Sequence, residues 1–131
     1  MIGECFYYDT PPNDKHLFVV LAPCLEQKGR FVCVNITTKK DDSETTDKTC
    51  ELRQGEHQEL TSPVSIVVYA QSRSMPPALI ERLMGEQKLP PFDGELLLKI
   101  QKAPLSDTSR LKKGFKKSIQ KHLEERHATG S

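Results

Sequence analysis

Apolar residues gather in two closely spaced runs near the start of the chain, 17–22 (LFVVLA) and 31–36 (FVCVNI). Both runs are rich in valine, isoleucine and phenylalanine, whose branched and aromatic side chains favour strands. The polar segment between them contains Gly29 and has the length of a hairpin connection. The pattern therefore predicts an antiparallel hairpin as the central element of the fold.

Three further short apolar runs predict additional strands, and polar or proline-containing segments separate them. These strands are expected at residues 4–8, 49–52 and 65–71. The paired prolines Pro11 and Pro12 mark a turn, since proline cannot donate to a strand ladder. Gly55 suits a turn that needs a positive φ, and residues 40–48 (KDDSETTDK) predict a polar loop.

Helices are expected mainly in the second half of the chain. A short helix is predicted from about Met75 to Met84, with proline in its first turn. Segment 94–100 (GELLLKI) fits either a last strand or an extended arm, because its apolar run is too short to decide. A C-terminal helix is predicted from an N-cap at Ser106, followed by Asp107. One buried stripe is expected on it at Leu111, Phe115, Ile119 and Leu123.

Several short strands followed by a C-terminal helix predict a mostly β (α+β) fold, a small antiparallel barrel with helices covering it. The chain has 131 residues, which suits one domain, expected at 1–126 with a disordered tail at 127–131.

Charge is nearly balanced overall, with 19 Lys and Arg against 18 Asp and Glu, which argues against a globally basic nucleic-acid binder. The charge is unevenly distributed, however, because residues 102–121 hold seven Lys or Arg and a single acid, Asp107. We expect no membrane span and no signal peptide, and hence a cytoplasmic protein.

The four cysteines are widely spaced, and none forms a CxxC pair. In a chain without a secretion signal we expect them to be reduced and mostly buried. A Cys/His zinc site built with His16 or His57 is an alternative that the spacing does not favour.

Polar residues at the two open ends of the predicted hairpin suggest a functional site. Lys15 and His16 precede the first strand, whereas Thr37, Thr38 and Lys39 follow the second. These ends lie side by side in an antiparallel hairpin, so an imidazole, hydroxyls and ammonium groups share one rim of the sheet. The pattern predicts an anion site there, which we call the hairpin rim.

The order of these segments resembles the MazF/PemK-like family of toxin endoribonucleases. Four short motifs in this sequence carry the resemblance: GECFYYD at 3–9, KHLFVV at 15–20, ITT at 36–38 and QSRS at 71–74. They are similar to the family's opening strand, its second strand, the Ile-Thr-Thr/Ser that ends its third strand and its later Gln-h-Arg-Thr strand, where h is apolar.

The resemblance implies an SH3-like barrel, a homodimer, a peptide antitoxin and metal-independent, cofactor-free cleavage of single-stranded RNA. In that chemistry a ribose 2′-hydroxyl attacks its own phosphate and leaves a cyclic phosphate end. It implies catalytic roles for a set of four residues: His16, Thr37, Thr38 and Arg73. Substrate contacts are expected from Lys15, Lys39, Gln71 and His57, of which His57 follows the Gly55 turn beside Glu56.

One difference from the family pattern leaves a second interpretation open. His16 stands where the family has a catalytic arginine, and histidine suits proton transfer better than permanent charge stabilisation. The alternative is therefore a catalytically inactive SH3-like barrel that binds a peptide or nucleic acid.

Overall fold

The computed structural model describes residues 1–10, 15–39, 48–106 and 110–129, with the side chains described to residue 126. The predicted loop at 40–48 and the N-terminal part of the predicted helix at 107–109 lie largely outside these residues. Within the described part, no helix is long and apolar enough to cross a membrane.

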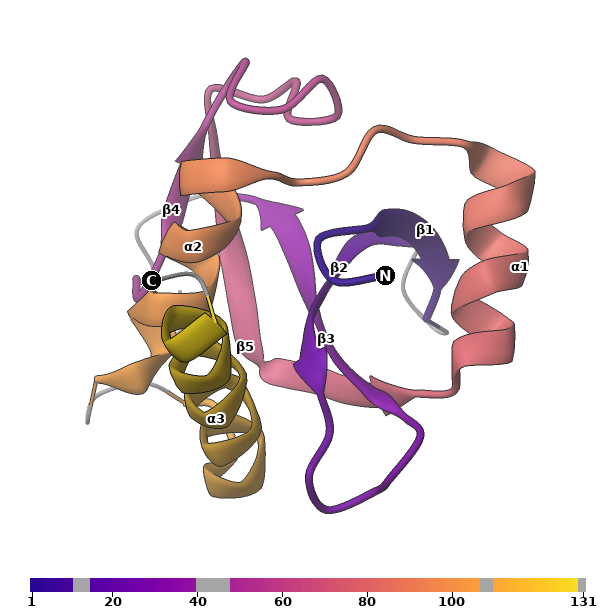
Figure 1. Ribbon diagram of the computed structural model, residues 1–131. Coiled ribbons are helices and arrows are strands. Elements are labelled where there is room, and N and C mark those ends of the chain that lie inside the picture. Colours follow the sequence, from indigo (N-terminus) through magenta and orange to yellow (C-terminus); the bar gives the residue numbers. More distant parts are fainter. Residues whose placement is uncertain (11–14, 40–47, 107–109, 130–131) are drawn as a thin grey trace.

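Five antiparallel strands form one sheet in the order β1-β2-β3-β5-β4 (Figure 1). Their bounds are β1 Cys5–Asp9, β2 Lys15–Pro23, β3 Phe31–Thr38, β4 Glu51–Arg53 and β5 Val64–Met75. The central hairpin is confirmed: β2 pairs with β3, and Leu17 lies opposite Ile36. Bulges interrupt the register between Val20 and Ala22 and between Cys33 and Asn35. β1 and β4 are the edge strands among the described residues, so the α+β class is confirmed and the sheet there is not a closed barrel, while the SH3-like arrangement stays a prediction.

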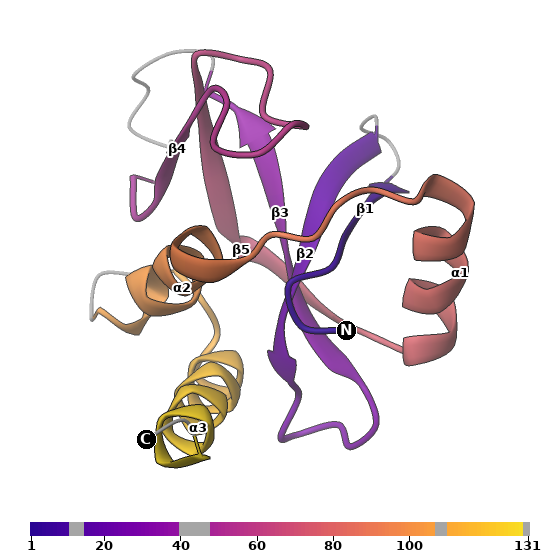
Figure 2. The same ribbon diagram turned by 45° about the horizontal axis from the view of Figure 1, so that its top comes forward.

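Helices cover both faces of the sheet (Figures 1 and 2). The helices are α1 Pro77–Gln87, α2 Gly94–Lys102 and α3 Lys113–Thr129, with a 3₁₀ turn at Ala103–Leu105. Because side-chain direction alternates along a strand, Leu17, Val19 and Leu21 point to the side of α2 and α3, which we call the α2/α3 face. Phe18 and Val20 point to the other side, where they pack with Ile80 and Leu83 of α1, and this is the α1 face.

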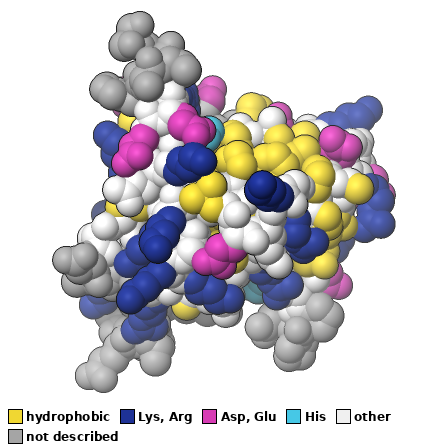
Figure 3. Space-filling view, turned by 60° about the horizontal axis from the view of Figure 1, so that its bottom comes forward, with side chains coloured by type: hydrophobic (Ala, Val, Ile, Leu, Met, Phe, Trp, Pro, Cys, Tyr) yellow, Lys and Arg dark blue, Asp and Glu magenta, His cyan; other side chains and the backbone are white. Residues whose placement is uncertain are grey.

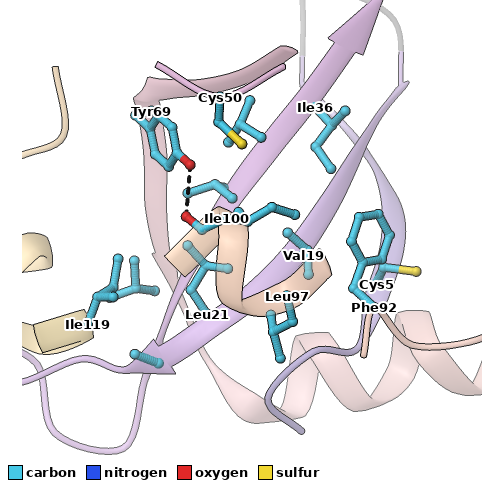
Figure 4. Close-up of a cluster of buried hydrophobic side chains, with 14 of the residues drawn as sticks. Cys5, Val19, Leu21, Ile36, Cys50, Tyr69, Phe92, Leu97, Ile100 and Ile119 are labelled. Carbon is cyan, nitrogen blue, oxygen red and sulfur yellow. Dashed lines mark hydrogen bonds between the residues drawn. The ribbon is translucent and has the colours of Figure 1, made fainter. Parts of the chain in front are cut away.

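The larger core lies on the α2/α3 face (Figure 4). Leu97 and Ile100 of α2 pack there beside Ile119 of α3, and the Tyr69 hydroxyl donates a hydrogen bond to the Ile100 carbonyl at 2.8 Å. The stripe expected on the C-terminal helix is confirmed for Phe115 and Ile119, which are buried, and for Leu123, which packs against the same core, whereas Leu111 lies before the helix.

The segment predicted as a last strand or an extended arm is helix α2, so that prediction was wrong. Leu97, Ile100 and Gln101 are buried at i, i+3 and i+4 spacing, which is helical. Glu95 in the first turn and Lys99 and Lys102 in the last turn also match the helix dipole. Three consecutive leucines hid this period in the sequence.

The ends of two predicted helices also differ from the structure. Ser106 follows the 3₁₀ turn and α3 begins at Lys113, so the N-cap prediction at Ser106 was wrong. Leu111 is buried before the helix starts. α3 continues to Thr129, three residues into the predicted tail, and α1 ends at Gln87 rather than Met84.

The buried hydrogen bond of Tyr69 gives a direct test of this core. Tyr69→Phe leaves the Ile100 carbonyl without this donor, so we expect the free energy of unfolding to fall by about 1–2 kcal/mol. The matched control is Tyr8→Phe, whose hydroxyl has no hydrogen bond within the described part of the chain and whose ring packs on Phe18. Urea denaturation of both variants checks the prediction, and equal losses would contradict it.

Candidate functional site

An open cleft of about 250 Å³ lies where β2 begins and β3 ends. Segment 54–63, which connects β4 to β5, lies beside the end of β3 and forms the second wall (Figure 2). The lining residues come from four strands and this segment: Tyr7, Lys15, His16, Leu17, Ile36, Thr37, Thr38, Glu59, Leu60, Thr61, Ser62 and Ser65. The structure thus places four of the predicted site residues (Lys15, His16, Thr37 and Thr38) at one cleft, which we call the rim cleft.

The two threonines of the hairpin rim occupy different faces of the sheet. Thr38 turns toward the cleft, because its Oγ1 lies 3.0 Å from Oγ of Ser62. Strand alternation puts Ile36 on the same face and Thr37 on the opposite one. Thr38 is therefore the threonine whose hydroxyl is available inside the rim cleft.

Lys15 and His16 also lie on opposite faces of the sheet. Lys15 shares the face of Leu17 and is exposed, so its ammonium group, which forms no ion pair with another described residue, can meet an anion at the mouth of the cleft. His16 is half-buried and pairs with Tyr8 across the strands, and alternation directs its ring to the face of Phe18. His16 lines the cleft, but Lys15 is the better placed cation.

A carboxylate held by hydrogen bonds forms the far side of the cleft. The Tyr7 hydroxyl donates to Oε1 of Glu59 at 2.9 Å, and the Gln58 amide donates to Oε2 at 3.2 Å. Burial and the hydrogen bond to Glu59 raise the pKa of Tyr7 to about 12, so the phenol stays a donor at neutral pH. Sequence reasoning missed Tyr7 and Glu59, because Tyr7 looks like an ordinary strand residue and Glu59 lies in an irregular turn.

His57 lies outside the rim cleft and has a structural role. It is buried, and its ring stacks on Phe92 with a centroid distance of 4.2 Å. Nδ1 accepts the backbone N–H of Glu59 at 3.1 Å, which leaves Nε2 to donate to the Pro90 carbonyl at 2.8 Å. The predicted substrate contact is therefore corrected: His57 positions the backbone of Glu59 because both ring nitrogens are bonded within the fold.

Arg73 and Gln71 lie toward the other end of the sheet. β5 runs antiparallel to β3, so Arg73 pairs with Cys33 near the start of β3, whereas Thr38 pairs with Ser65. Five residues of β3 separate Cys33 from Thr38, roughly 17 Å of strand. Arg73 does not line the rim cleft, and its guanidinium lies 6.0 Å from the Phe18 ring centroid.

The remaining predicted contacts, Gln71 and Lys39, are engaged in the fold. The Gln71 amide oxygen accepts a hydrogen bond from the buried Asn35 at 2.9 Å. The Lys39 ammonium forms an ion pair with Glu51 at 3.1 Å, so its charge is already balanced. Neither residue lines the rim cleft.

The cysteines are free and buried. Burial raises the pKa of Cys33 and, with Glu4 and Glu59 nearby, that of Cys5 to about 12, so both thiols stay protonated and poorly nucleophilic. The Cys5 thiol donates to the Pro90 carbonyl at 3.2 Å. Among residues 1–10, 15–39, 48–106 and 110–129, no group of three His, Cys, Asp or Glu side chains could hold a metal ion, and this includes the surroundings of His16 and His57.

Comparison of the chain with models of protein families, with curated proteins and with solved structures finds no match. The resemblance to the MazF/PemK-like family therefore stays a prediction that rests on its four short motifs.

Proposed function

We propose that the rim cleft binds a phosphodiester of single-stranded RNA and that the protein is a toxin-like, metal-independent endoribonuclease. One observation carries the proposal: segments far apart in the sequence bring an ammonium group, a positioned carboxylate and hydroxyl donors to the same cleft. Cleavage by an RNA 2′-hydroxyl needs a base, an acid and a positive charge near the phosphate.

The residues of the rim cleft can be assigned to these roles. The carboxylate of Glu59 takes the proton from the 2′-hydroxyl as its oxygen attacks phosphorus. The bond from phosphorus to the 5′ oxygen breaks, and Lys15 supplies a proton to that oxygen while its charge stabilises the phosphorane. Thr38 donates a hydrogen bond to the phosphate, and Tyr7 keeps its single O–H on Glu59. His16, which also lines the cleft, is the alternative proton donor. The products carry a 2′,3′-cyclic phosphate and a 5′-hydroxyl.

The proposal extends to the finer fold and to the partners that the resemblance implies. The bulges in β2–β3 and β3–β5 bend strands, and such bends support an SH3-like barrel arrangement of the sheet. A homodimer and a peptide antitoxin that covers the cleft belong to the same proposal.

The proposal is tested with purified protein and a mixed-sequence, single-stranded RNA in excess EDTA. We expect cyclic-phosphate ends, and no cutting of a DNA strand of the same sequence, because DNA lacks the attacking 2′-hydroxyl. Equal cutting of DNA, or loss of all cutting in EDTA, would contradict the proposed chemistry.

A second candidate function is RNA binding without cleavage. It is favoured by one observation: the described lining of the rim cleft contains no arginine, and Arg73 lies near the start of β3. A guanidinium clamp on the phosphate is therefore missing from the cleft. Saturable RNA binding with no product in the EDTA assay would select this candidate.

A further inference from the structure

A second charged surface lies on α3 and the residue before it. Five lysines form it, and we call it the lysine face: Lys112, Lys113, Lys116, Lys117 and Lys121. All are exposed except Lys116, which is half-buried. Lys and Arg side chains gather on the left part of Figure 3, the side on which α2 and α3 lie in Figure 1.

The fold itself makes little use of these charges. Lys121 forms an exposed ion pair with Glu125 at 3.7 Å, and Lys116 donates to the Ser106 carbonyl. Within the described residues, Lys113 and Lys117 have no carboxylate partner, although they stand at i, i+4 spacing. Like charges at this spacing destabilise a helix by about 0.2–0.5 kcal/mol. The arrangement therefore weakens the helix slightly, and a bound anion would offset the repulsion.

We propose that the lysine face binds the phosphate backbone of RNA outside the rim cleft. The choice of RNA rests on the proposed function, whereas the binding of a polyanion rests on the lysines themselves. A row of ammonium groups suits a chain of regularly repeated phosphates, because each cation neutralises one phosphate and releases counterions. A membrane surface fits less well, since Leu25 is the single exposed large apolar residue beside α3 in the described part of the chain.

The lysine face and the rim cleft lie toward opposite ends of β2. α3 is fixed near the C-terminal end of that strand, where the backbone N–H of Leu25 donates to Oγ of Ser118 at 2.9 Å. The cleft lies at Lys15, nine residues of strand away, or roughly 30 Å. A strand of RNA that reaches both must therefore be long, so contacts to the lysine face should depend on RNA length.

The test compares fluorescence anisotropy of a labelled RNA of about 25 nucleotides, made uncleavable by 2′-deoxy substitution, between wild type and Lys113→Gln/Lys117→Gln. Each phosphate contact on a single strand contributes about 0.7 to the slope of log affinity against log salt. Two lost contacts reduce the slope by about 1.4, so raising salt from 50 to 200 mM weakens the variant about sevenfold less than wild type. An RNA of about four nucleotides should bind both proteins equally.

The matched control is Arg82→Gln/Lys88→Gln on and beside α1, which removes the same charge from exposed positions on the α1 face. We expect the control to keep the wild-type slope. Equal slopes for the two double variants would overturn the proposal, as would equal competition by a poly-glutamate peptide at the same ionic strength. A changed slope together with no product in the EDTA assay would support the lysine face while the nuclease proposal fails.

Discussion

Replacing Glu59 by glutamine is expected to slow RNA cleavage by about 10²–10⁴-fold, the usual loss when a general base is removed. The amide keeps an oxygen that accepts the Tyr7 hydrogen bond, so the shape of the rim cleft should survive. It cannot take the proton of the 2′-hydroxyl. Single-turnover cleavage rates at saturating protein measure the effect on the chemical step.

Glu56→Gln is the matched control, since Glu56 lies in the same irregular segment and does not line the rim cleft. Its carboxylate accepts the backbone N–H of Arg53 at 2.5 Å and so has a structural partner. We expect this variant to cleave at nearly the wild-type rate. Equal losses in both variants, or an undiminished rate in Glu59→Gln, would remove Glu59 from the mechanism.

Gly3→Ala is expected to cause the largest loss of stability. Gly3 has φ +90°, and a β-carbon there would lie 2.5 Å from the Phe92 carbonyl oxygen. The backbone has little freedom to move away, because Gly3 N–H donates to Val20 at 2.8 Å and Phe92 N–H donates to Gly3 at 2.7 Å. Positive φ and steric overlap together should cost about 3 kcal/mol, which lowers Tm by roughly 10 °C.

Gly55→Ala separates the two causes. Gly55 has φ +88°, close to that of Gly3, but a β-carbon there meets no atom within 4 Å. We expect a loss of about 1 kcal/mol from the backbone conformation alone. Thermal unfolding of both variants gives the comparison, and a Gly3→Ala protein as stable as Gly55→Ala would contradict the contact with Phe92.

Local patterns in the sequence predicted the hairpin well. Side chains of the apolar runs in β2 and β3 point alternately to the two sides of the sheet, and helices cover both sides. Antiparallel pairing of these two strands is enough to bring Lys15 near Thr38. The positive φ at Gly55 was also predicted correctly from its place in a turn.

The position of Arg73 in the sheet follows from strand direction. β5 extends to Met75, and because it runs antiparallel to β3 its last residues meet Phe31 at the beginning of that strand. A motif at the end of β5 therefore lies far from the threonines that end β3. Strand order and direction are non-local properties, which a list of short motifs in the right sequence order does not contain.

The remaining site residues depend on irregular backbone. Glu59 reaches the rim cleft because His57 is fixed between Phe92 and the Glu59 N–H, and Phe92 belongs to a segment more than 30 residues further along the chain. Neither the spacing of apolar residues nor the presence of turn-forming residues indicates such a contact. In the same way α2 was missed because its three leucines mask a helical period that burial reveals.

The central claim is that the functional site is the rim cleft. It is tested most directly by amide chemical shifts of ¹⁵N-labelled protein titrated with a short RNA of about four nucleotides, made uncleavable by 2′-deoxy substitution. We expect the largest shift changes at Lys15, Thr38 and Glu59–Ser62, with little change along α3. Changes centred on Gln71 and Arg73, or no change at a saturating concentration of RNA, would contradict the claim.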